Sequence, residues 1–167
     1  MMNCESYLLD SQALALIAYK DDLGSLSKIV TLHGTYTSKK SPAQLLHLAC
    51  LHNQSTVQIQ KKVASAVLKF KHKPPFLVSQ DVGVFPTSSS KHETCCYIFN
   101  HFFTPTEIDK STTLLTFSNG ATVTVPVSMH IVQQQNGRLH TLLSHSTQLR
   151  KELYFDQYLF SSDRMNR

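Results

Sequence analysis

The stretch that decides the fold is TLLTFSNGATVTVPV, residues 113–127. Two runs rich in threonine, leucine and valine flank Asn119-Gly120, and such runs are typical of extended strands. Asn-Gly readily adopts the positive φ angles of a type I′ turn, which joins two antiparallel strands. The sequence therefore predicts a β-hairpin here and an antiparallel sheet as the basis of the fold.

The segments before this hairpin predict further strands. CCYIFNHFF, residues 95–103, is apolar and aromatic enough to be a buried strand. FLV and GVF, at 76–78 and 83–85, flank a turn at 79–81. Short apolar runs separated by Asp-containing turns predict an antiparallel meander with strands near 6–9, 13–19 and 28–32.

Two regions have helical patterns. Ser41 is a suitable N-cap and Pro42 suits the first helical position, so we expect a helix near 42–53. From about residue 130 leucines recur at helical intervals, and SSDRMNR, residues 161–167, reads as a flexible tail. The predicted fold class is α+β: an antiparallel β-rich core with a short helix near 42–53 and C-terminal helices, in one domain over 1–160.

The segment between Thr56 and Pro75 is less regular. We favour a helical turn that begins after Thr56 and ends near Lys62, followed by a strand over about 65–72 that the two prolines terminate. In this strand Leu68, Phe70 and His72 would share one face, and Lys69, Lys71 and Lys73 the other. Such lysines would lie ~7 Å apart, close to the spacing of phosphates along one nucleic-acid strand.

The charge of the chain is concentrated in one block. The chain carries a net charge of +5, yet residues 23–80 hold eight lysines and no carboxylate. These are Lys28, Lys39, Lys40, Lys61, Lys62, Lys69, Lys71 and Lys73. Local ion pairs cannot neutralise such a block, so we interpret it as a surface for phosphate rather than as a solubilising surface alone.

Several classes of protein are disfavoured. The first residues lack the pattern of a signal peptide and no segment approaches the ~18 apolar residues of a membrane span, so we expect a cytosolic protein with no membrane partner. The four cysteines then remain thiols. Cys95 and Cys96 would point to opposite faces of a strand, which argues against a shared zinc ion with His92 or His101.

Catalysis is also disfavoured. The chain has no nucleophile elbow, no glycine-rich phosphate loop and no pair of carboxylates placed as acid and base. We therefore expect no enzyme activity, no cofactor and no metal. Binding to RNA would require exposed aromatic side chains, but the block has none between Tyr36 and Phe70. Lysine without arginine suits the phosphates of duplex DNA better than guanine readout.

Several short motifs occur in a characteristic order. They are HKPP at 72–75, FPTSSS at 85–90 with Cys95 after it, and FSNG at 117–120 with a strand ending at Pro126. KKSPAQLL at 39–46 and the lysine pair at 61–62 precede them. Taken together, these motifs resemble the ComK competence transcription factors of Gram-positive bacteria, and the resemblance runs from about Tyr7 to Leu149.

The resemblance implies a transcriptional activator of the genes for DNA uptake and recombination. It implies recognition of A/T-rich boxes, largely from the minor groove, by dimers that assemble into a tetramer. It also implies degradation through a proteolytic adaptor and a Clp-type protease. On this interpretation Lys61, Lys62, Lys69, Lys71 and Lys73 contact double-stranded DNA, with Lys39 and Lys40 assisting.

The alternative hypothesis is a non-catalytic interaction module. It would use the same lysine-rich surface to bind RNA or an acidic protein partner.

Overall fold

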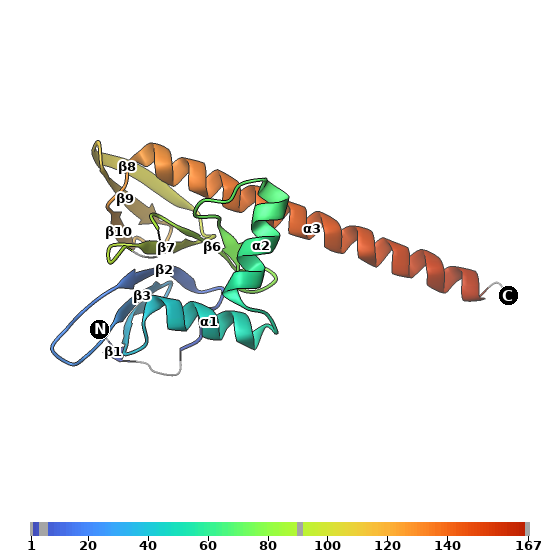
Figure 1. Ribbon diagram of the computed structural model, residues 1–167, viewed down its shortest axis with the longest axis horizontal. Coiled ribbons are helices and arrows are strands. Elements are labelled where there is room, and N and C mark those ends of the chain that lie inside the picture. The colour runs from blue at the N-terminus through green and yellow to red at the C-terminus, as the bar shows by residue number, and fades with distance from the viewer. Residues whose placement is uncertain (1, 4–6, 90–91, 166–167) are drawn as a thin grey trace.

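The computed structural model describes residues 2–3, 7–89 and 92–165 (Figure 1). Within these residues, ten strands and three helices follow one another, which confirms the α+β class. The strands are β1 (Met2–Asn3), β2 (Ala13–Ala18), β3 (Ser27–Thr31), β4 (Gly34–Ser38), β5 (Phe76–Leu77), β6 (Gly83–Pro86), β7 (Cys96–Phe99), β8 (Phe103–Asp109), β9 (Thr112–Phe117) and β10 (Thr122–Val125). The helices are α1 (Pro42–His52), α2 (Val57–Leu68) and α3 (Met129–Met165).

A seven-stranded sheet with the order β1-β4-β3-β2-β7-β6-β5 forms the larger part of the core. The strands expected at 13–19 and 28–32 are present as β2 and β3, which pair antiparallel. The third strand of this meander is β4, which the sequence analysis did not predict. The predicted turn at 79–81 joins β5 to β6. The strand expected at 6–9 is wrong for residues 7–9, and residue 6 lies outside the described residues. The Asp10 carboxylate accepts from the Tyr7 hydroxyl and the Gln12 N–H, which holds a turn instead.

The second sheet has three strands in the order β10-β9-β8 and contains the predicted hairpin. Its turn is not type I′, because φ is positive at Gly120 (+84°) but not at Asn119. Gly120 N–H donates to Phe117 O, and Phe117 N–H donates to Ala121 O. This pattern is a three-residue loop with a glycine bulge, and the Asn119 amide holds it by donating to Leu32 O at 3.1 Å.

Replacing Gly120 should destabilise the protein through its backbone conformation alone. A Cβ at Gly120 would meet no atom within 4 Å, but an L-residue rarely adopts φ +84°. Gly120→Ala should therefore lower the free energy of unfolding by ~1 kcal/mol, measured by urea denaturation. Gly137→Ala, at an exposed position in the first third of α3, should raise the free energy of unfolding by ~0.5–1 kcal/mol. Equal stabilities for the two variants would contradict the assigned loop.

Helix α1 begins as the sequence predicts. Ser41 is the N-cap, its hydroxyl accepts from Gln44 N–H, and the Gln44 side chain accepts from Ser41 N–H in a capping box. The buried side chains of α1 are Leu45, Leu46, Ala49 and Cys50. They share one cluster with Leu16, Ile29 and Phe99 of the large sheet, so α1 covers one face of that sheet.

Helix α2 is longer than the sequence analysis expected. Thr56 caps it by accepting from Ile59 N–H, but the helix continues to Leu68, so the strand at 65–72 is wrong. Ala64 and Ala66 favour helix, and the chain leaves it only at Lys69, which adopts left-handed φ and ψ of 53° and 39°. Lys69, Lys71 and Lys73 therefore lie in a loop over residues 69–75, here called the basic loop, and not along one face of a strand.

One helix, α3, occupies the C-terminal region where the sequence predicted helices. Its first half packs on both sheets, and its second half extends away from the body of the molecule (Figure 1). The helix includes residues 161–165, and residues 166–167 lie outside the described residues. The flexibility of the tail over 161–167 stays a prediction. In the described part of the chain, no helix combines the length and the apolar character that crossing a membrane requires.

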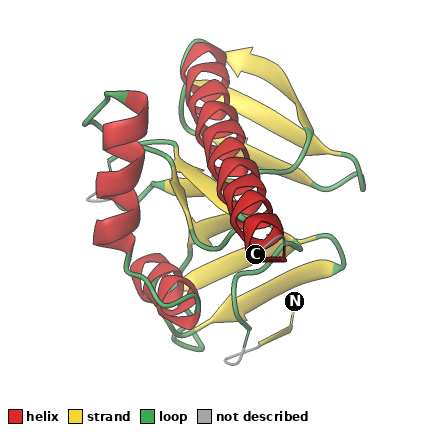
Figure 2. Ribbon diagram, turned by 90° about the vertical axis from the view of Figure 1, so that its right-hand side faces the viewer, coloured by secondary structure: helices red, strands yellow, loops and turns green. Residues whose placement is uncertain are grey.

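The large sheet has a hydrophobic cluster on each face. One cluster joins it to α1, and the other joins it to the three-stranded sheet and to Val132 and Leu139 of α3. Figure 2 shows α1 and α2 on one side, the small sheet on the other and α3 between them. Cys95 belongs to the first cluster and Cys96 to the second, which confirms that the two side chains point to opposite faces.

Candidate nucleic-acid interface

The C-terminal part of α2 and the basic loop enclose an open groove of about 470 Å³, here called the basic groove. Helix α2 supplies one wall, the basic loop supplies a second, and the residues after β6 supply a third. The lining residues are Lys61, Lys62, Ser65, Lys71, Lys73, Pro74, Pro86, Ser88, Ser89 and Tyr97. Four lysines are thus gathered around one hollow from two separate segments of the chain.

The described lining of this groove carries positive charges and no negative charge to neutralise them. Of the ten described residues that line it, four are lysines and none is a carboxylate. Lys62, Lys71 and Lys73 are exposed, whereas Lys61 is half-buried with its Nζ 5.6 Å from the centre of the Phe76 ring. Lys61 lines the basic groove and also a neighbouring hollow that Phe76 lines. The arrangement suits a ligand with several negative charges, such as a row of phosphates.

The structure separates the other predicted lysines from this groove. Lys69 is exposed at the end of α2 and does not line the groove. Lys39 and Lys40 lie between β4 and α1, where the Lys40 carbonyl accepts from the Ser27 hydroxyl at 2.6 Å. Of the seven lysines predicted to contact DNA, four are therefore brought together around one groove, and contact with DNA stays a prediction for all seven.

Sequence reasoning missed the uncharged residues of the groove. Ser65 comes from α2, Ser88 and Ser89 follow β6, and Tyr97 lies in β7. Tyr97 is only 5% exposed. This burial, with contributions from the Cys95 side chain, raises the pKa of its phenol well above the ordinary value, so the phenol is neutral. FPTSSS contributes to the family resemblance, but no local pattern connects it to α2.

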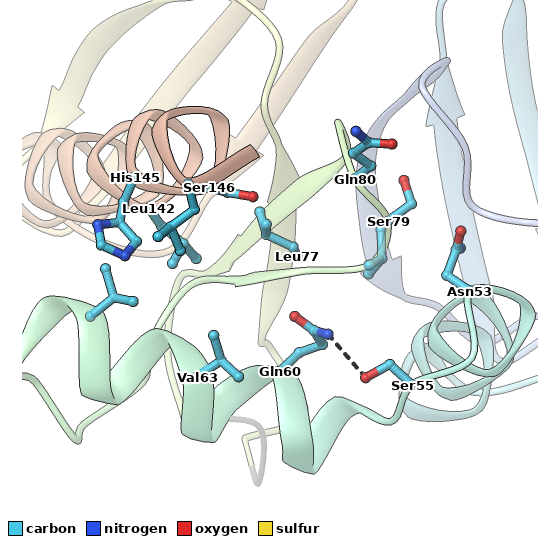
Figure 3. A pocket seen from close by; sticks show the side chains of 13 residues that line it. Asn53, Ser55, Gln60, Val63, Leu77, Ser79, Gln80, Leu142, His145 and Ser146 are labelled. Atoms are coloured by element: carbon cyan, nitrogen blue, oxygen red, sulfur yellow. Dashed lines mark hydrogen bonds between the residues drawn. The ribbon is translucent and has the colours of Figure 1, made fainter. Parts of the chain in front are cut away.

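A second hollow of about 370 Å³ lies between α2, α3 and the turn after β5 (Figure 3). Val63 of α2, Leu77 of β5 and Leu142 of α3 form its apolar part. Around them are uncharged polar groups, among them Gln60, whose Nε2 donates to Ser55 Oγ at 2.9 Å. None of the lining residues is lysine, arginine or a carboxylate, so this hollow does not share the electrostatic character of the basic groove.

The described cysteines behave as packing residues. Cys50, Cys95 and Cys96 are buried free thiols, and burial raises the pKa of both Cys50 and Cys96 to about 11. A thiol with this pKa is protonated at neutral pH and is a poor nucleophile and metal ligand. Within residues 2–3, 7–89 and 92–165, no group of three or more histidine, cysteine, aspartate or glutamate side chains could hold a metal ion.

Comparisons with known proteins agree with the resemblance seen in the sequence. The family model described as ComK protein matches residues 4–151. A competence transcription factor of Bacillus subtilis (strain 168) is 32% identical over 136 residues, which are 78% of this chain and 70% of that protein. No solved structure matches this chain. The family match covers most of the 167 residues, so the chain belongs to the ComK family.

Proposed function

We propose that this protein is a DNA-binding transcriptional activator of genetic competence, and that the basic groove contacts the phosphates of A/T-rich duplex DNA. Membership of the ComK family and similarity to a competence transcription factor support the biological role. The observation that carries the proposed surface is the gathering of Lys61, Lys62, Lys71 and Lys73 around one groove without a carboxylate.

The groove chemistry favours phosphate contact over base readout. Lysine is a compact cation that binds phosphate as a point charge, whereas reading guanine usually takes the planar fork of arginine. A/T-rich tracts have a narrow minor groove with enhanced negative potential, which attracts cationic side chains. Sequence preference would then arise mainly from the shape and potential of the DNA, with lysines on the phosphates and at the mouth of the minor groove.

An RNA-binding role has less support from the same surface. Recognition of single-stranded RNA generally uses aromatic rings on which bases stack. The aromatic residue that lines the basic groove, Tyr97, is buried in β7 and offers no exposed face for stacking. An acidic protein partner is the remaining alternative, because four lysines would also attract clustered carboxylates.

Other features of the proposal rest on family membership. We propose a homodimer or tetramer on paired boxes, action in the cytoplasm where bacterial DNA lies, and no catalysis or cofactor. Degradation through an adaptor and a Clp-type protease is proposed on the same basis.

A binding experiment with matched duplexes tests the function. Fluorescence anisotropy would compare an A/T-rich duplex with a G/C-rich duplex of equal length near physiological salt, with polyglutamate as an acidic competitor. We expect the A/T-rich duplex to bind at least ~10-fold more tightly. Polyglutamate, added at the same molar concentration of negative charges as the DNA, should displace the A/T-rich duplex poorly. Equal affinity for both duplexes would contradict A/T preference, and efficient displacement by polyglutamate would favour the acidic-partner alternative.

A further inference from the structure

The basic loop adopts a conformation that lysine residues rarely take. Among the described residues other than glycine, φ is positive only at Gln54, Lys69 and Lys73, so two of the three lie in the basic loop. Lys69 has φ 53° and Lys73 has φ 47°. Residues held in such sparsely populated regions persist only when the surrounding structure enforces the conformation. The contacts that enforce it therefore control where the lysines of the loop lie.

One of these contacts is a buried amide from α3. Gln135 is only 2% exposed, and its Nε2 donates to both Lys73 O and Pro86 O at 2.9 Å. A single NH₂ group thus joins the end of the basic loop to the end of β6, which form two walls of the basic groove. The oxygen of the same amide accepts from Arg138 Nη1 at 3.0 Å, so both ends of the Gln135 side chain are fixed.

Arg138 contacts the start of the basic loop. Its guanidinium carbon lies 3.5 Å from the centre of the Phe70 ring, a close stacking contact. The Phe70 ring in turn meets His72 edge-on, with 6.3 Å between ring centres. Gln135 and Arg138 lie one turn apart on α3 and together contact the loop at Phe70 and Lys73, on either side of Lys71.

We propose that Gln135 and Arg138 are positioning residues that hold the basic loop in its DNA-binding conformation. Neither lines the basic groove, so their effect on DNA would act through the placement of Lys71 and Lys73 opposite Lys61 and Lys62. This inference rests on the proposed function. A loop ordered before binding does not lose conformational entropy when it meets the phosphates, and affinity is higher for that reason.

The first variant removes the amide donors and keeps the size of the side chain. Gln135→Met leaves Lys73 O and Pro86 O without their donor, so the loop should open more often. Hydrogen exchange of the free protein, followed by mass spectrometry of peptides covering residues 69–75, should become faster. Affinity for the A/T-rich duplex should fall about tenfold, a typical cost of ordering a loop on binding. The slope of log affinity against log salt should stay within about 0.5 of the parent, because the same lysines still neutralise phosphates.

The second variant removes the contact between Arg138 and Phe70 and keeps the positive charge. Arg138→Lys keeps the positive charge and removes the planar group that stacks on Phe70, so a weaker affinity cannot be ascribed to lost charge. It should accelerate exchange in the same peptides and weaken binding without flattening the salt slope. Arg150→Lys is the matched control on α3, because Arg150 pairs with Asp81 at 3.3 Å and does not line the groove. It should change neither exchange in the loop nor affinity.

Three results would overturn the inference. They are unchanged exchange of residues 69–75 in both variants, parent affinity despite faster exchange, and an affinity loss in Arg150→Lys as large as in Arg138→Lys. A different result would show that the proposed function of the groove is itself wrong. If Lys61→Gln/Lys62→Gln binds A/T-rich DNA like the parent, the basic groove is not the DNA surface, and the role of Gln135 and Arg138 in DNA binding is wrong with it. Exchange in the free protein still shows in that case whether the two residues order the loop.

Discussion

Phe103→Ala is expected to lower the free energy of unfolding by ~3–5 kcal/mol, the typical cost of removing a buried phenylalanine. Phe103 begins β8 and is 7% exposed. Its ring centre lies 6.5 Å from that of Phe85 in the large sheet and 5.8 Å from that of Phe117 in the small sheet. The three rings thus join the two sheets, and truncating the middle one leaves a cavity at their junction.

The neighbouring residue provides the matched control. Phe102 is 79% exposed, so Phe102→Ala should stay within ~0.5 kcal/mol of the parent. Both variants lose the same atoms one position apart, and urea denaturation with a common slope would compare them directly. A larger loss in Phe102→Ala than in Phe103→Ala would mean that the chain at the start of β8 presents the opposite face to the core, since a shift of one residue exchanges the faces of a strand.

The elements that could be predicted are those that a few neighbouring residues in the sequence specify. Ser41-Pro42 with Gln44 three positions after the N-cap specifies the start of α1. Asn119-Gly120 specifies a hairpin, although the exact turn depends on the contact of Asn119 with Leu32, 87 residues away in sequence. The alternation of Cys95 and Cys96 between two clusters also follows from strand geometry alone.

The segment after Thr56 could not be predicted because its decisive contacts are distant in sequence. The alternation from Leu68 to Lys73 is short, and it begins inside a helix favoured by Ala64 and Ala66. What fixes the chain after Lys69 is α3, through Arg138 on Phe70 and Gln135 on Lys73, 62 residues away. No local pattern contains that information.

The candidate site was predictable in composition but not in arrangement. A block of lysines without a carboxylate indicates a phosphate surface wherever its members lie. A row along one strand would present them in a line, whereas the structure places Lys61 and Lys62 on one wall of a groove and Lys71 and Lys73 on another. Lys39 and Lys40 belong to the same block in sequence but not to the groove, because β4 and α1 carry them elsewhere.

Removing the charges of the groove should have the largest effect on DNA binding. The variant replaces four lysines with glutamine, which keeps part of each side-chain stem: Lys61→Gln, Lys62→Gln, Lys71→Gln and Lys73→Gln. Each lysine that neutralises a phosphate of duplex DNA contributes about 0.9 to the slope of log affinity against log salt. Four such contacts predict a slope flatter by about 3 to 4. Anisotropy titrations on A/T-rich DNA between about 50 and 200 mM salt would measure it.

A second fourfold variant separates the groove from net charge. Lys20→Gln, Lys28→Gln, Lys110→Gln and Lys151→Gln change the total charge equally, but none of these four lysines lines the basic groove. Long-range attraction depends on the total charge, so both variants should lose some association rate. Counterion release requires contact, so only the groove variant should lose most of the slope. If the two slopes fall equally, the lysines act as a diffuse positive field, and the groove is not where the duplex lies.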